Sequence, residues 1–160
     1  SASVSQPDTI RALAQRMLER RIKPELEIFD LGMANFAKVL AKEGLVDNQA
    51  YANILLGNIS GAQADLLHVG TLLKDMPEEW TVCLAGLGRT QLTANTLGIL
   101  YADGARVGLE DNLWFDSGRT ALASNLMLVK RLVELSNALG RPLLTRQETR
   151  CRLGLAMPAK

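Results

Sequence analysis

The sequence predicts an α/β fold built on a parallel sheet, with helices and strands alternating along the chain. Three observations carry this prediction. Short runs typical of strands recur along the chain, each is followed by apolar residues at helical spacing, and glycines mark many of the junctions. Each strand with its helix spans about 30 residues, which is the length of a βαβ unit. Parallel strands need such long crossover connections, so one parallel sheet is expected.

The first element is a helix over about residues 7–20, where Ser5, Pro7 and Asp8 resemble a helix start and apolar residues then recur at helical spacing. Residues 25–30 alternate between acidic and apolar side chains, which predicts a strand that ends before Gly32. The helical period then returns around Phe36 and runs until Gly44.

The remaining chain repeats this cycle. An apolar run over residues 52–56, closed by Gly57, predicts the second strand. The later elements expected are a helix over 62–74, a strand over 80–85, a helix over 90–101, a short strand over 106–109, a long helix over 119–139 and a last short helix over 146–153.

Two architectures fit four strands that are each followed by a helix. One is a small open doubly wound sheet, complete in itself. The other is part of a (β/α)8 barrel, which needs about 250 residues as a whole. The opening helix lacks a strand of its own and the chain lacks an initiator methionine, which favours the second architecture. We therefore expect residues 1–160 to form a single region: four βα units making the carboxyl-terminal half of a TIM-type barrel, preceded by one helix of the missing half.

Composition excludes several function classes. The 160 residues carry 18 Lys and Arg against 17 Asp and Glu, so a net charge of +1 provides no general attraction to nucleic acid. The longest apolar runs are far shorter than the roughly 20 residues of a membrane span, so no membrane partner is expected. Two cysteines, Cys83 and Cys151, exclude a disulfide framework and indicate a reducing, cytoplasmic setting.

Ligands of parallel α/β folds gather at the carboxyl ends of the strands, which here are polar. In the first strand Leu26 and Ile28 are expected to face the helices, so that Glu25 and Glu27 point into the barrel. Pairing with a Lys or Arg is an alternative explanation for Glu25. Glu27 lies nearer the carboxyl end and is the better functional candidate.

The last expected strand places Arg106, Gly108 and Glu110 on one side, with Gly108 leaving room for a ligand or metal near the backbone. Glu110 and Asp111 are adjacent carboxylates that resist joint ionisation unless a cation or a general-base function uses them. An acid pair at a helix N-terminus is the structural alternative. His68 is the only histidine, and we expect it to pack or cap a helix rather than hold a metal.

These residues resemble a known family, the β-keto acid cleavage enzymes of the 3-keto-5-aminohexanoate cleavage enzyme type. The resemblance rests on residues 23–32 (KPELEIFDLG), on the segment from Leu56 to Gly61, on Ala85-Gly86 and above all on residues 106–112 (RVGLEDN). It implies a zinc-dependent (β/α)8 barrel and a homo-oligomer. The implied reaction condenses a β-keto acid with acetyl-CoA to give acetoacetate and a new acyl-CoA.

The resemblance also implies residue roles. Glu110 corresponds to the carboxylate ligand of zinc, Asp111 to the base of the chemical step and Arg106 to the group that holds the substrate carboxylate; Glu27 is a pocket acid that contacts the substrate. The family's His-x-His metal pair has no counterpart in this sequence, so the 160 residues alone are expected to be inactive. The alternative from another class is a non-catalytic half barrel that binds a ligand or assembles with a partner.

Overall fold

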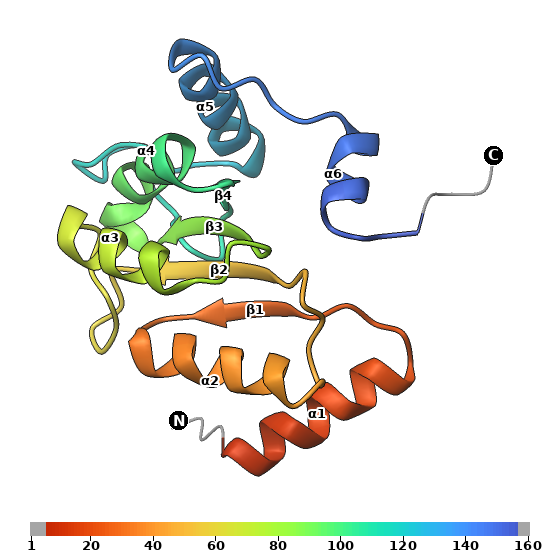
Figure 1. The fold of residues 1–160 in the computed structure, drawn as a ribbon. Helices are drawn as coiled ribbons and strands as arrows, with labels where there is room; N and C mark the ends of the chain where they lie inside the picture. The colour runs from red at the N-terminus through yellow and green to blue at the C-terminus, as the bar shows by residue number, and fades with distance from the viewer. Residues whose placement is uncertain (1–5, 157–160) are drawn as a thin grey trace.

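A single sheet of four parallel strands, with helices between them, organises the computed structural model, which describes residues 6–156 (Figure 1). The elements in order are α1 (Pro7–Glu19), β1 (Glu25–Ile28), α2 (Leu31–Lys42), β2 (Tyr51–Leu56), α3 (Leu66–Asp75), β3 (Thr81–Gly86), the short 3-10 helix η1 (Gly88–Thr90), α4 (Gln91–Tyr101), β4 (Gly104–Ala105), α5 (Asn125–Ala138) and α6 (Arg146–Arg152). The predicted alternation of helices and strands is confirmed.

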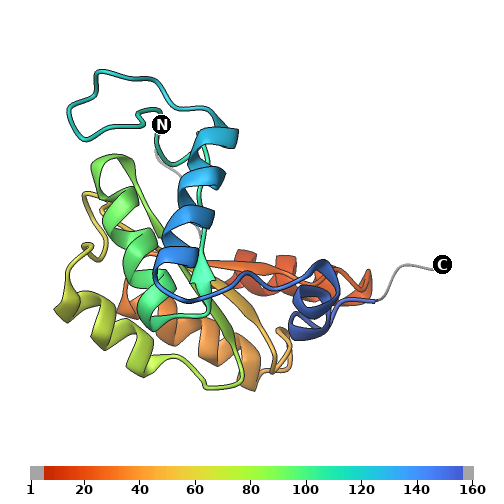
Figure 2. The same ribbon diagram turned by 90° about the horizontal axis from the view of Figure 1, so that it is seen from above.

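The strands lie in the sheet in the order in which they occur in the chain, β1-β2-β3-β4, and all three pairs are parallel. A doubly wound sheet reverses its strand order at a switch point, and no reversal occurs among these strands. Because parallel crossovers are right-handed, a sequential order places the helices on one face, as Figure 2 shows for α2, α3 and α4. The fold is therefore α/β, with four βα units of the TIM-barrel type.

The core lies between the sheet and these helices. Alternate strand residues face the helices, among them Ile28, Ile54 and Leu84, which are at most 1% exposed. They pack against helix residues such as Leu40 and Leu72. The same alternation turns the other residues of each strand toward the opposite face, which is the inner face of a barrel. The position of the candidate site thus follows from the period-two pattern.

The last predicted strand is misplaced. Residues 106–109 were expected to be extended, but β4 is the preceding Gly104–Ala105, paired with Cys83 and Leu84. The Arg106 amide still donates to the Leu84 carbonyl (3.0 Å), after which the chain turns and both the Asp111 and Asn112 amides donate to the Gly108 carbonyl. Gly104 lies close to neighbouring backbone: its carbonyl is 2.5 Å from the position that a Cβ on Gly98 of α4 would occupy. Apolar periodicity does not reveal such a short strand of small residues.

The long helix predicted over 119–139 begins later, at Asn125. Residues 113–123 instead form a small hairpin in which Trp114 bridges Leu122 and the Asp116 carboxylate accepts from the amides of Thr120 and Ala121. Ser124 then caps α5 by accepting from the Met127 amide (3.2 Å). In the same way the helix predicted over 62–74 starts only at Leu66, where Asp65 caps α3. In both cases an Asp or Ser side chain satisfies backbone amides at the start of the helix or in the loop before it.

The helix α6 lies apart from the others, at the amino ends of the strands (Figure 1). Arg152 at its end forms an ion pair with Asp103, the residue before β4. Within residues 6–156, no helix is long and apolar enough to cross a bilayer.

Candidate active site

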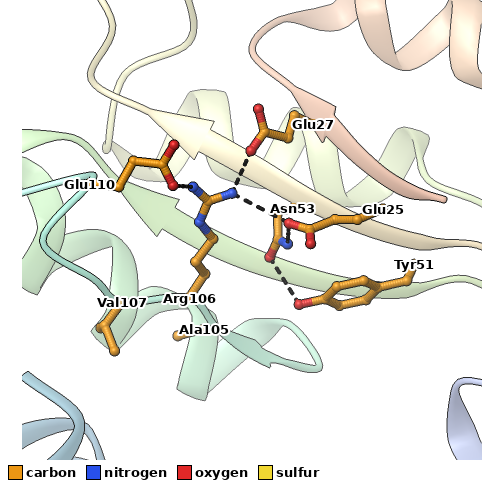
Figure 3. Close-up of a pocket in the computed structure, with 8 residues that line it drawn as sticks. All are labelled: Glu25, Glu27, Tyr51, Asn53, Ala105, Arg106, Val107 and Glu110. Atoms are coloured by element: carbon orange, nitrogen blue, oxygen red, sulfur yellow. Dashed lines mark hydrogen bonds and ion pairs between the residues drawn. The ribbon is translucent and has the colours of Figure 1, made fainter. Parts of the chain in front are cut away.

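One arginine and four carboxylates meet on the inner face of the sheet. Arg106 follows β4. Its guanidinium contacts acidic side chains from β1, at one edge of the sheet, and from the turn after β4, at the other edge; Figure 3 shows three of them. Its hydrogen-bond partners are Glu25 (3.3 Å), Glu27 (2.5 Å), Glu110 (3.0 Å) and Asp111 (3.2 Å). An open hollow of about 670 Å³ lies over this cluster. The site thus joins residues about 80 positions apart in the sequence.

Asp111 is the buried member of the cluster. Its side chain is 2% exposed, and both of its oxygens accept from Arg106. Burial raises the pKa of Asp111 above its ordinary value, and Arg106 opposes this by stabilising the charged form. A carboxylate with a raised pKa is a stronger base, which suits it to accept a proton.

Charge at the site is unbalanced. Desolvation alone would lower the pKa of Arg106, but the hydrogen bond to Glu27 and the charge of Asp111 outweigh it, so the pKa of Arg106 is raised. The guanidinium therefore stays protonated. Four carboxylates around one guanidinium leave an excess of negative charge that a bound cation would offset.

Two polar side chains of β2 are linked by hydrogen bonds to Glu25, and the sequence analysis did not predict them. The Tyr51 hydroxyl donates to Asn53 Oδ1 (3.3 Å), and Asn53 Nδ2 donates to Glu25 Oε1 (2.5 Å), which in turn accepts from Arg106 (Figure 3). Asn53 is 1% exposed. An asparagine within an otherwise apolar strand was the available signal, because a buried amide needs hydrogen-bond partners.

The structure places the predicted site residues as follows. Glu25 and Glu27 face the inner side of the sheet, as the alternation predicted, and Glu25 does pair with an arginine. Glu110 is close to Arg106, but through a turn rather than through a strand. Gly108 was expected to leave room beside Arg106; instead it does not line the hollow, and its carbonyl accepts from Gln91 (3.3 Å).

The structural alternative for the acid pair is wrong. The alternative explanation was that Glu110 and Asp111 are an acid pair at a helix N-terminus. The next helix, however, begins 14 residues after Asp111, at Asn125. Both carboxylates bind Arg106 instead. His68 lies in the first turn of α3 with an exposed side chain, and its Nδ1 accepts from the Gln63 amide (3.1 Å), while Asp65 rather than His68 caps the helix.

The donors needed for a metal site are not grouped together in the described part of the chain. Among residues 6–156 no three His, Cys, Asp or Glu side chains are arranged to hold a metal ion. Glu110 has a largely exposed side chain beside the hollow and can offer one carboxylate. Zinc sites use three or four protein ligands, so the described residues alone do not make one.

Sequential parallel βα units with a polar inner face define a chain of the TIM-barrel type, a class of fold in which ligands bind at the carboxyl ends of the strands. More specifically, the chain belongs to the β-keto acid cleavage enzyme family, whose model matches residues 1–155. This agrees with the resemblance seen in the sequence.

Individual relatives agree with this assignment. The chain is 33% identical over 149 residues to 3-dehydrocarnitine:acetyl-CoA trimethylamine transferase of Rhizobium meliloti, covering 93% of this chain and 49% of that protein. It is 36% identical over 153 residues to 3-keto-5-aminohexanoate cleavage enzyme of Fusobacterium nucleatum, covering 95% and 55%. The chain thus spans about half the length of these curated relatives.

A solved structure shares the fold. The binary complex of ObcA with oxaloacetate superposes with a TM-score of 0.74 at 18% identity, over 95% of this chain and 42% of that one. At this identity the match concerns the fold alone.

Proposed function

We propose that residues 1–160 form the carboxyl-terminal half of a zinc-dependent β-keto acid cleavage enzyme. The complete protein would condense a β-keto acid with acetyl-CoA and release acetoacetate and a new acyl-CoA. Relatives named for acetyl-CoA transfer and for keto acid cleavage support this proposal. The observation that carries it is the pairing of Arg106 with buried Asp111 beneath an open hollow.

Arg106 would hold the carboxylate of the substrate. A guanidinium presents parallel N–H donors that match a carboxylate at two points. In the structure these donors are distributed over Glu27, Glu110 and Asp111. A substrate carboxylate would replace the more exposed of these partners, Glu27 or Glu110, so Glu27 would lie against the bound substrate.

Asp111 would act as the base. Condensation requires removal of a proton from the carbon between the keto and carboxyl groups, and a carboxylate with a raised pKa is suited to accept it. Because Arg106 binds Asp111 and would also bind the substrate carboxylate, one guanidinium would set the distance between base and substrate.

Zinc, when bound, would polarise the keto oxygen of the substrate. Glu110 would supply one ligand from this chain, and the excess negative charge around Arg106 favours a cation beside it. The other ligands would come from outside the described residues.

The proposal is tested on the full-length protein, by which we mean this chain with any residues that naturally precede or follow it. A coupled assay would measure acetoacetate formation from acetyl-CoA and a panel of β-keto acids in the presence of zinc. We expect turnover with at least one acid. Absence of turnover with every acid would overturn the proposal.

Zinc is tested separately. The Glu110→Gln change removes a charged ligand with little change of shape, so the zinc content of purified protein should fall below one equivalent. Elemental analysis measures this, with Glu78→Gln, at an exposed residue before β3, as the matched control. Full zinc occupancy in the Glu110→Gln protein would contradict the assignment.

The half-barrel alternative is decided by the intact mass of the natural protein. A mass on the order of 30 kDa, as expected for a complete barrel, supports the enzyme. A mass of 17.4 kDa would favour a binding or assembly module instead. We further propose a homo-oligomer in the cytoplasm, where the free thiols of Cys83 and Cys151 would stay reduced.

A further inference from the structure

A second cavity, lined by three arginines, lies beside the candidate active site. Its volume is about 150 Å³, and its walls come from the η1 turn, the start of α4, the hairpin over 113–123 and α5. The arginines are Arg89 on η1, Arg119 on the hairpin and Arg131 on α5. Three arginines from three separate segments thus line one small cavity.

These cations have no acidic partner in the part of the chain that the structure describes. No carboxylate forms an ion pair with Arg89, Arg119 or Arg131 there. Asp116 also lines the cavity, but its oxygens accept from Thr120 and Ala121 of its own hairpin. The cavity therefore keeps an excess of positive charge.

Arg131 shows this excess most clearly. Its guanidinium is partly buried, donates to the Phe115 carbonyl (2.6 Å) and the Gln91 side chain (3.4 Å), and stacks on the Phe115 ring. All of these partners are neutral. Burial lowers the pKa of Arg131, with no compensating acid. A partly buried cation that meets only neutral groups is stabilised when an anion binds beside it.

Arg119 has an uncommon backbone conformation at the rim of the cavity. Its φ of 57° is uncommon for a residue with a side chain, and its amide donates to the Asp116 carbonyl (3.2 Å). Its Nη2 lies 4.0 Å from the position that a Cβ on Gly88 would occupy. Strained conformations of this kind concentrate at binding sites, where surrounding contacts maintain them.

The cavity is coupled to the base of the proposed reaction. The Gly88 amide donates to the Asp111 carbonyl (2.7 Å), and Asn112, the next residue, lines the cavity. In TIM barrels a phosphate site is frequently formed by the loops after the seventh and eighth strands together with a helix N-terminus. If this chain is the second half of a barrel, β3 and β4 are those strands.

We propose that this cavity binds a phosphate group of the nucleotide end of acetyl-CoA. The inference rests on the proposed function, which makes acetyl-CoA the second substrate. The volume accommodates one phosphate group but is below the roughly 300 Å³ at which pockets enclose a whole small molecule. Arginine forks match phosphate oxygens geometrically, and the three guanidinium groups supply the charge.

The test uses full-length protein and calorimetric titration with CoA and with dephospho-CoA, which lacks the 3′-phosphate. The double variant Arg89→Ala/Arg119→Ala is compared with wild type and with Arg20→Ala, an exposed arginine at the end of α1. We expect the Kd for CoA to rise roughly tenfold or more in the double variant and to stay unchanged in Arg20→Ala. An equal rise for dephospho-CoA assigns the diphosphate, and a rise for CoA alone assigns the 3′-phosphate.

Turnover with S-acetylpantetheine, a thioester without phosphate groups, provides the second readout. The double variant should use it as well as wild type does, while its KM for acetyl-CoA rises. An unchanged Kd for CoA, or equal losses with both thioesters, would overturn the proposal. Should the double variant melt early, the single change Arg119→Gln at an exposed side chain replaces it.

The two proposals fail in different ways. If wild type turns over a β-keto acid but the arginine variants bind CoA normally, the phosphate site is wrong and the enzyme function stands. If CoA binding depends on the arginines and no β-keto acid is cleaved, the phosphate site stands and the proposed reaction is wrong.

Discussion

Asp111 and Arg106 form a two-point contact in which Nε lies 3.2 Å from Oδ2 and Nη2 lies 3.2 Å from Oδ1. Only 2% of the Asp111 side chain and 17% of the Arg106 side chain is exposed. Both charges are thus largely withdrawn from water and depend on each other. Changing either one is expected to alter the proton affinity of the other.

The Asp111→Asn change tests the base. Asparagine preserves the shape and one acceptor oxygen but cannot take up a proton, so kcat should fall roughly a hundredfold or more. Zinc content should match wild type, because Glu110 is unchanged. Wild-type kcat in this variant would mean that another group is the base.

The pH profile tests the raised pKa. The base works only when ionised, and burial raises the pKa of Asp111, so kcat/KM should decline as the pH falls through a value above the ordinary 3.8. Arg106 lowers this pKa by its charge, so Arg106→Gln should move the acid limb to higher pH. A limb that moves to lower pH would contradict the coupling.

The Asn53→Ala change tests the support of Glu25 and Arg106 from β2. Loss of the Asn53 amide frees Glu25, and Arg106 then loses one of its fixed partners. We expect the KM for the β-keto acid to rise several-fold, because Arg106 would hold its carboxylate less accurately. Loss of folding alone would lower the active fraction without changing KM.

Tyr51→Phe is the matched control for Asn53→Ala. It removes the donor to Asn53 but leaves the contact between Asn53 and Glu25, so its KM should stay closer to wild type. Equal effects of the two changes would contradict the claim that the direct contact between Asn53 and Glu25 sets the position of Arg106.

Two glycines test the packing that supports the site. A Cβ on Gly86 would lie 2.6 Å from the Gln91 Cα, so Gly86→Ala should lower the free energy of unfolding by about 2 kcal/mol or more. A Cβ on Gly70, within α3, would meet no neighbour within 4 Å. Gly70→Ala should therefore raise the free energy of unfolding by about 0.5–1 kcal/mol. Urea unfolding measures both, and similar effects of the two changes would contradict the predicted close contact at Gly86.

Long periodic elements were predictable and short irregular ones were not. The helix at 7–20 and the apolar strand at 52–56 lie within a residue of α1 and β2, because their patterns reflect one buried face. The two-residue β4 carries no periodicity, and its place depends on pairing with Cys83 and Leu84. The hairpin over 113–123 depends on local hydrogen bonds of Asp116 that compete with a helix.

The site was predictable where alternation decides which way a side chain points. Glu25 and Glu27 could be assigned to the inner face because a strand has a period of two. Arg106 and Glu110 were placed on one side by the same rule, but a turn brings them together. The burial of Asp111 and the support from Asn53 involve residues distant in sequence, which a local pattern does not contain.

By itself, the sequence determined the alternation of strands and helices, the inward direction of the β1 acids and the family, because each depends on local periodicity or on a contiguous motif. Only the tertiary structure decided that four carboxylates share Arg106 and that Arg89, Arg119 and Arg131 line one cavity. Charges and burial depend on distances in space, and the crossover helices bring together residues that lie far apart along the chain.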